Sequence, residues 1–289
     1  MSLVLYILVF ISCFYLMLVV LSVNTFNPKD WLIKTLRRDS LQDAYRLQSF
    51  LMHNSDLSKK DSIPEYKFYT EIVSILFNCR NSFGGEVETS LFEVRKNIGR
   101  DVKETRKLRE LFLSGVMQNL FLSGFIIFFY FYSRFTVQSP ISFIEMAILS
   151  CWLFGGIIFF IIAFKVIERK RFSLFQSYLV SFYKFKVLLS ISRPINQILK
   201  ESNIGELKNS KSVGHLKIRI ENLVKKIKNT GKFSQFEMDF IMTEIWDFFE
   251  FELVKFNKIT NMLKLLSIMI FVLPCFLYST LSLMEHFNL

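Results

Sequence analysis

Histidine and cysteine, the side chains most often used as metal ligands or nucleophiles, are scarce in this chain. Its 289 residues include three histidines and four cysteines. The histidines (His53, His215 and His286) lie far apart, and no cysteine pair has the spacing of a metal-binding or redox motif. We therefore expect no catalytic constellation, metal site or cofactor. The cysteines, Cys13, Cys79, Cys151 and Cys275, are expected to be buried packing residues.

Charged side chains are absent from four long apolar runs. The runs are Leu3–Val23, Leu111–Tyr132, Met146–Phe164 and Leu265–Met284. Each has about 19 to 22 residues, which suits a helix that crosses a hydrocarbon core of about 30 Å. A helix of a soluble domain normally keeps a polar face instead. The runs predict a polytopic membrane protein with four transmembrane helices, of which the second is interrupted by Gln118 and Asn119.

Lysine and arginine are almost absent outside two segments. Of the 36 Lys and Arg, only Arg134 lies outside residues 24–110 and 165–264. Because cytoplasmic flanks carry an excess of Lys and Arg, both segments are predicted to be cytoplasmic and both termini to lie outside. The first apolar run follows no basic region and has no small-residue cleavage site, so we interpret it as a retained anchor rather than a signal peptide.

These patterns divide the chain into five predicted parts. They are an N-terminal transmembrane anchor (1–23), a cytoplasmic helical segment (24–110), a transmembrane hairpin (111–166), a second cytoplasmic helical domain (167–262) and a C-terminal transmembrane helix with a short outer tail (263–289). The net charge of +11 is explained by the positive cytoplasmic segments and anionic lipid. Since no nucleic-acid-binding motif accompanies this charge, we expect no nucleic acid partner.

The alternating apolar pattern of β-strands is also missing, so the predicted fold class is all-α. Apolar residues at helical spacing predict helices in both cytoplasmic segments. The expected helices are Glu65–Cys79, Glu86 onward into the second run, Phe172–Leu189, Ile195–Glu201, Leu216–Lys228, and Gln235 onward through the fourth run. A turn is expected at Asn81–Gly85, and a polar loop at Asn203–Ser212.

Basic residues are missing between Lys232 and Lys255, where six acids occur. These are Glu237, Asp239, Glu244, Asp247, Glu250 and Glu252. The acids are explained either by a solvated helix face or by a docking surface for a basic cytoplasmic partner. For the second interpretation, spacing by three places Glu244, Asp247 and Glu250 on one helical face, and they are the candidate docking residues.

Only one proline lies in the four apolar runs. Pro274 has no backbone N–H, so it should leave a carbonyl unpaired one turn earlier and kink the fourth span. The kink has either a structural role alone or a role in positioning the bundle of spans.

The closing span and two turns resemble the type II secretion F family, in particular its short four-span branch in tight-adherence (Tad) pilus assembly. Lys264–Phe276 resembles the family's closing "K-L-L … L-P-x-F" span, and Leu188–Ile195 and Thr230–Ser234 resemble turns of its cytoplasmic domain. Ser190 departs from the glycine usual in the first of these turns. The stretch after Ser234 is shorter than in the family, which puts the domain's last helical hairpin in doubt. The resemblance covers the whole chain in layout but only Phe172–Leu281 in sequence.

The resemblance implies an inner-membrane platform of bacteria and not an enzyme. Such platforms couple a cytoplasmic hexameric ATPase to extraction of pilin or pseudopilin subunits from the membrane. The implied partners are this secretion ATPase, a second platform subunit or further copies of the chain, the pilin or pseudopilin, and lipid. Glu244, Asp247 and Glu250 would then face the ATPase or the second subunit. Two other classes are a membrane scaffold or signalling anchor without a motor, and a small transporter, although the runs lack the ionisable groups that usually mark a transport pathway.

The predicted orientation can be tested by cysteine labelling from the periplasmic side, in a background without native cysteines. A cysteine placed at Ser139 should be modified, because it lies in the outer hairpin, whereas one at Ser210 should be protected. The reverse pattern would rule out the orientation and the platform function with it.

Overall fold

The described part of the chain is entirely helical in its regular elements. The computed structural model describes residues 40–53, 63–83, 88–138, 142–190, 194–207 and 213–286. Every regular element in these ranges is a helix, so the all-α prediction is confirmed there. The predicted first span, Leu3–Val23, lies outside the described residues.

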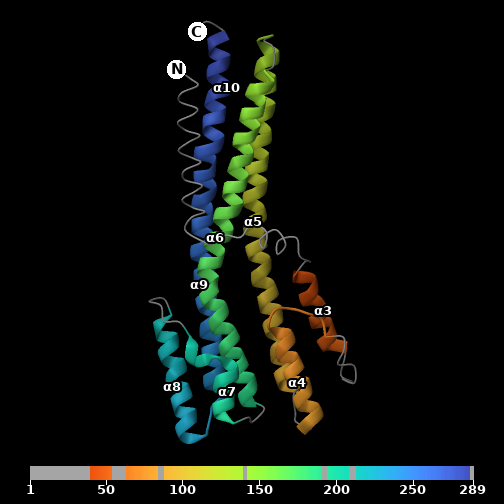
Figure 1. Ribbon diagram of the computed structural model, residues 1–289, viewed down its shortest axis with the longest axis vertical. Helices are drawn as coiled ribbons and strands as arrows, with labels where there is room; N and C mark the ends of the chain where they lie inside the picture. Colours follow the sequence, from red (N-terminus) through yellow and green to blue (C-terminus); the bar gives the residue numbers. More distant parts are fainter. Residues whose placement is uncertain are drawn as a thin grey trace. The chain divides into compact units, whose positions relative to one another are not determined.

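Three long helices carry the other apolar runs (Figure 1). They are α5 (Glu88–Thr136), α6 (Phe143–Ser190) and α9 (Gln235–Ser267), which continues through the π-helical segment η3 (Ile268–Val272) into α10 (Leu273–His286). Each is long and apolar enough to cross a membrane, which indicates a membrane protein. The expected continuity of the preceding helices into the second and fourth runs is confirmed, and α6 is continuous in the same way.

The chain divides into two compact units. One, here called the apolar unit, contains Leu108–Glu168 and Phe256–Leu289; the other, the polar unit, contains Arg38–Lys107 and Arg169–Lys255. The long helices α5, α6 and α9 each contribute residues to both units.

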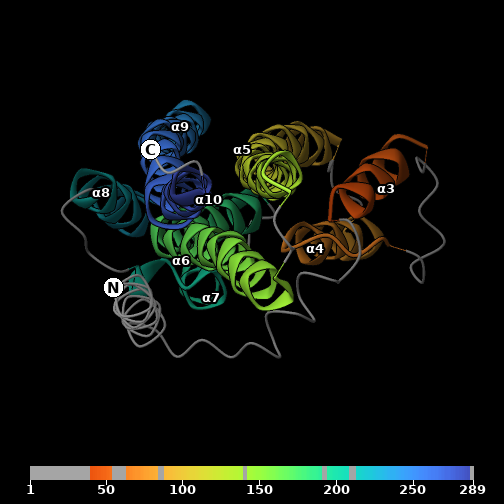
Figure 2. The ribbon, with the colours of Figure 1, turned by 90° about the horizontal axis from the view of Figure 1, so that it is seen from above.

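The polar unit contains several shorter helices besides its parts of α5, α6 and α9 (Figure 2). They are α3 (Ser40–His53), α4 (Tyr69–Phe83), α7 (Ile195–Ser202), the 3-10 helix η2 (Ile204–Glu206) and α8 (Gly214–Thr230). The helix expected at Glu65 starts later because Lys67, at φ 45°, has a left-handed backbone that an α-helix excludes. The expected polar loop after α7 includes η2, whose Ile204 is buried.

The apolar stripes predicted for the polar unit form its core. Ile72, Val94, Leu223 and Trp246 are each at most 1% exposed. Burying an aliphatic or aromatic side chain of this kind stabilises the fold by about 1.5–3 kcal/mol. The Phe175 ring lies 5.4 Å from Trp246, between centroids, and so joins α6 to α9. The helical periodicity of the sequence therefore identified which faces pack inward.

The apolar unit has a smaller core. A buried cluster of Ile126, Tyr130, Leu149, Leu153, Val272 and Cys275 joins α5, α6, η3 and α10. Other large side chains point outward, among them Phe121 at 77% and Phe143 at 80% exposed. Such outward apolar side chains suit contact with the hydrocarbon of a bilayer. The helical backbone suits the same environment, because every backbone polar group there must be hydrogen-bonded within the protein.

The left-handed backbone of Gly231, in the turn after α8, can be tested by substitution. Gly231 caps α8 at φ 64°, and a Cβ there would meet no atom within 4 Å. The change Gly231→Ala should therefore lower the free energy of unfolding through the backbone alone, by about 1 kcal/mol. Urea denaturation in detergent, followed by tryptophan fluorescence, to which the buried Trp246 contributes, measures this loss. Gly205→Ala is the matched control, since its Cβ is equally unobstructed and its φ is not positive; equal losses for both variants would contradict the explanation.

Candidate functional site

The candidate docking acids of α9 have partners inside the polar unit. The Glu244 carboxylate accepts from Arg219 of α8 at 2.6 Å and lies 3.5 Å from His215. Asp247 and Glu250 both face Arg100 of α5, at 3.9 and 3.4 Å. The structure therefore divides the three acids between two neighbouring helices, with Glu244 paired to α8, and Asp247 and Glu250 paired to α5.

The other three acids of this stretch are paired in the same way. Glu237 accepts from Lys226 of α8 at 2.7 Å, and Glu252 from Arg171 of α6 at 2.7 Å. Asp239 binds Lys186 of α6. All six acids thus pair with bases of other helices. Neither interpretation of the sequence, a solvated helix face or a docking surface, included these ion pairs.

These contacts bear on the docking prediction, which stays a prediction. The Asp247 and Glu250 side chains are 66% and 51% exposed, so a partner could reach them, whereas Glu244 is 22% exposed. Reversing all three charges would break ion pairs within the chain. A loss of partner binding in such a variant would therefore not isolate a docking surface.

Lys186 forms an ion pair in which the ammonium group is buried. Its side chain is 7% exposed, and its Nζ lies 2.7 Å from a Glu93 carboxylate oxygen of α5 as well as binding Asp239 of α9. An ammonium group buried without a partner would cost several kcal/mol. The two carboxylates therefore fix α5, α6 and α9 to one another within the polar unit. Nothing in the sequence singled out Lys186. Its partners Glu93 and Asp239 lie 93 and 53 positions away in the chain, and no local pattern links residues so far apart.

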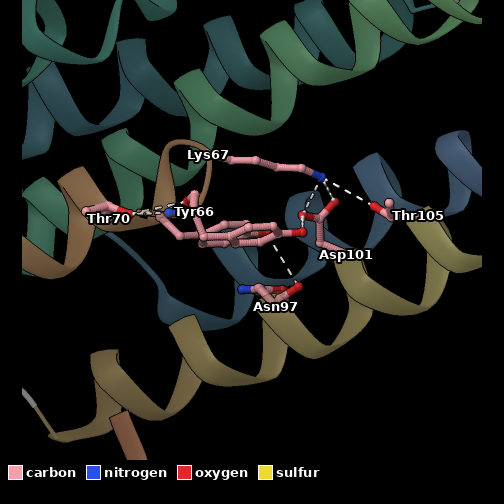
Figure 3. Close-up of polar contacts among 7 residues, drawn as sticks. Tyr66, Lys67, Thr70, Asn97, Asp101 and Thr105 are labelled. Atoms are coloured by element: carbon pink, nitrogen blue, oxygen red, sulfur yellow. Dashed lines mark hydrogen bonds and ion pairs between the residues drawn. The ribbon is translucent and has the colours of Figure 1, made fainter. Parts of the chain in front are cut away.

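A second polar cluster attaches the start of α4 to α5 (Figure 3). The Tyr66 hydroxyl donates to Asp101 at 2.6 Å, and Lys67 Nζ donates to both carboxylate oxygens at 2.8 and 2.7 Å. Lys67 also reaches Thr105 at 3.4 Å. Lys67, which makes this bidentate contact, is also the residue with the left-handed backbone before α4. Sequence reasoning missed the cluster, since its members come from segments that pair only in the folded unit.

Burial, followed by the neighbouring Asp101, raises the pKa of Tyr66 well above its usual value. Because the fold favours the neutral phenol, its contribution to stability is complete below the usual tyrosine pKa of about 10 and is lost as the pH rises toward the raised pKa. The cluster is therefore a structural anchor at neutral pH.

The predicted kink residue Pro274 follows a π-helical turn. The N–H of Leu273 donates to the carbonyl of Ile268, five residues earlier, which is the π pattern of η3. Such a turn adds one residue to the helix and changes the bonding of carbonyls near a proline. A π segment therefore ends two residues before Pro274, while the kink of the fourth span and its role in assembly stay predictions.

Buried polar groups lie beside this π segment in the apolar unit. The Ser267 hydroxyl, fully buried, donates to the Asn119 side chain at 3.0 Å and lies 3.4 Å from the carbonyl oxygen of Gly156. Asn119 in turn donates to the Gly115 carbonyl at 2.9 Å. These bonds connect α5, α6 and α9, as polar side chains do between membrane helices. The Asn119 interruption of the second run was the sequence signal for this junction.

The remaining sequence candidates are dispersed. Cys275 is buried as expected, but Cys151 is exposed on α6, so the packing prediction is wrong for it. Cys13 and the Cys79 side chain lie outside the described residues. Within the described ranges, no group of three or more His, Cys, Asp or Glu side chains could hold a metal ion.

Comparisons with known proteins do not assign a family. No family model, curated protein or solved structure matches the chain.

Beside this polar junction, Gly156 lets α6 pack closely against Phe271 of η3, which can be tested by substitution. A Cβ at Gly156 would lie 2.8 Å from Cβ of Phe271, an atom that cannot swing aside, whereas a Cβ at Gly155 would lie 3.7 Å from the far end of the same ring. Gly156→Ala should lower the free energy of unfolding by about 1–3 kcal/mol. Gly155→Ala should be neutral or stabilising by up to about 1 kcal/mol.

The measurement is denaturation by SDS in mild detergent, followed by tryptophan fluorescence. Trp152 contributes to this signal, and its ring lies 5.7 Å from Phe271 between centroids. Equal stability of the two variants would show that α6 and η3 do not pack as closely as described.

Proposed function

We propose that this chain is an inner-membrane platform of a type II secretion or Tad-type pilus machine of bacteria. It would couple a cytoplasmic ATPase to extraction of pilin or pseudopilin subunits. The proposal includes four spans, two cytoplasmic helical segments and both termini outside the cytoplasm. It assigns no chemical reaction to the chain.

The continuity of the long helices carries this proposal. α9 runs for 33 residues from Gln235 to Ser267 without a break, and α5 runs for 49 residues. Both begin in the polar unit. α5 contains the whole of the predicted second span, and α9 continues through η3 and α10, which contain most of the fourth. A helix whose backbone bonds are uninterrupted can transmit rotation or tilt along its length, which is the action required of a platform.

Two further features support the same role. Ion pairs of α9 with α5, α6 and α8 would let the polar unit move as one body when a motor acts on it. The π segment η3, next to Pro274, offers a place where α9 and α10 can change their bonding, as π turns often do at functional sites.

The identity of the partners can be tested by crosslinking in native membranes, followed by purification and mass spectrometry. The proposal expects a secretion-type ATPase, a pilin-like subunit and either a second platform subunit or further copies of this chain. Recovery of other partners without an ATPase would indicate a scaffold or signalling anchor. Solute flux through the purified protein in liposomes would indicate a transporter.

The coupling itself can be tested by interrupting α9. Insertion of Gly-Gly after Asn257, an exposed position of the helix, should abolish subunit assembly, because glycines weaken the helix by about 1 kcal/mol each. ATPase binding and membrane insertion should remain. The same insertion after Ser210, between η2 and α8, is the control and should leave assembly intact. Normal assembly with the α9 insertion would contradict transmission through this helix.

A further inference from the structure

The turn between α8 and α9 exposes bases and aromatic rings without any acid. All residues from 228 to 236 are exposed, and they include Lys228, Lys232, Phe233 and Phe236 but neither Asp nor Glu. Phe236 is 79% and Phe233 is 42% exposed. Exposed apolar side chains that occur together often mark an interaction site. We call residues 228–236 the α8–α9 turn.

Hydrogen bonds within the chain close this turn at the end of α8. The Gly231 N–H donates to the Ile227 carbonyl at 2.8 Å. The Thr230 hydroxyl donates to the Lys226 carbonyl at 2.8 Å and lies 3.2 Å from the Lys232 N–H, which donates to it. A surface that is already ordered loses less conformational entropy when it binds a partner.

The charges left over in this region are positive. Lys226 forms an ion pair with Glu237 at 2.7 Å. The other acids of α9 form ion pairs with bases of α5, α6 and α8. Among the residues that the structure describes, no carboxylate lies within ion-pair distance of Lys228 or Lys232. The complementary surface for the turn is therefore acidic, the opposite sign to the partner expected from the acidic stretch of the sequence.

The position of the turn along α9 favours a protein over a bilayer as the occupant. Phe236 lies in the first turn of α9, whereas the apolar run of the same helix begins at Leu265. About eight helical turns separate the two positions. Basic residues that bind lipid headgroups lie beside a membrane span or on an amphipathic helix. The apolar face of α8 is already buried within the protein, so it is not available to a bilayer.

We propose that the α8–α9 turn docks onto an acidic protein surface, with Phe233 and Phe236 entering an apolar pocket and Lys228 and Lys232 facing carboxylates around it. The identification of that partner as the secretion ATPase rests on the proposed function.

The test uses a purified secretion-type ATPase encoded in the same genome as this chain. It measures how tightly that ATPase binds the full-length protein in nanodiscs, at low and moderate salt. The double reversal Lys228→Glu with Lys232→Glu should weaken binding about tenfold or more at low salt, with a smaller effect at moderate salt. Phe233→Ala with Phe236→Ala should weaken it about tenfold at both. Circular dichroism should show unchanged helix content, because all four side chains are exposed.

Matched controls lie elsewhere in the polar unit. Lys96→Glu with Lys200→Glu reverses two other exposed lysines, and Phe92→Ala removes a ring that is 66% exposed; neither should change binding. If the turn variants bind like the wild type, the docking site is wrong and the platform function stands. If the wild type does not bind the ATPase, both are wrong.

A membrane contact is the other outcome. Flotation of the nanodisc-embedded protein with phosphatidylglycerol liposomes would then depend on Lys228 and Lys232, while ATPase binding would not. That result would overturn the proposal.

Discussion

The polar unit depends on the pairing of one enclosed ammonium group. Lys186 of α6 lies between carboxylates of Glu93 on α5 and Asp239 on α9, with 7% of its side chain exposed. Because the charge is costly to bury alone, the helices are held where both carboxylates can reach it. Arg171 and Arg100 add ion pairs between α9 and its neighbours further along. The aromatic core around Trp246 packs between the same helices, against Phe175 of α6 and Arg100 of α5.

The apolar unit has a different basis for its stability. Apolar surfaces gain little by leaving lipid for one another, so close packing and hydrogen bonds determine how membrane helices associate. Gly156 lets α6 approach Phe271 of η3, and the fully buried Ser267 bonds to Asn119 of α5. The same short stretch contains the π segment before Pro274. A buried polar contact and an irregular backbone therefore occur together in this part of the apolar unit.

The ion pairs of α9 also change the chemistry expected of a partner. Six acids without an intervening base suggested either a solvated helix face or a docking surface for a basic protein. Their carboxylates are instead bound to bases of α5, α6 and α8. The exposed charge near the start of α9 is then that of Lys228 and Lys232, beside exposed phenylalanines. The turn that comes before the acidic stretch therefore exposes basic side chains, although the helix after it is acidic in sequence.

The sequence by itself determined the helical class, three long apolar helices and the inward faces of most helices. These features depend on local periodicity and on run length, which do not require knowledge of distant residues. It also indicated Asn119 and Pro274 as irregular positions in apolar runs. Only the tertiary structure decided the partners of Lys186, the Tyr66–Lys67–Asp101 cluster and the division of Glu244 from Asp247 and Glu250. Ion pairs and hydrogen bonds between helices depend on which residues meet in space, and residues such as Asp101 and Lys67, 34 positions apart, carry no local pattern that announces their contact.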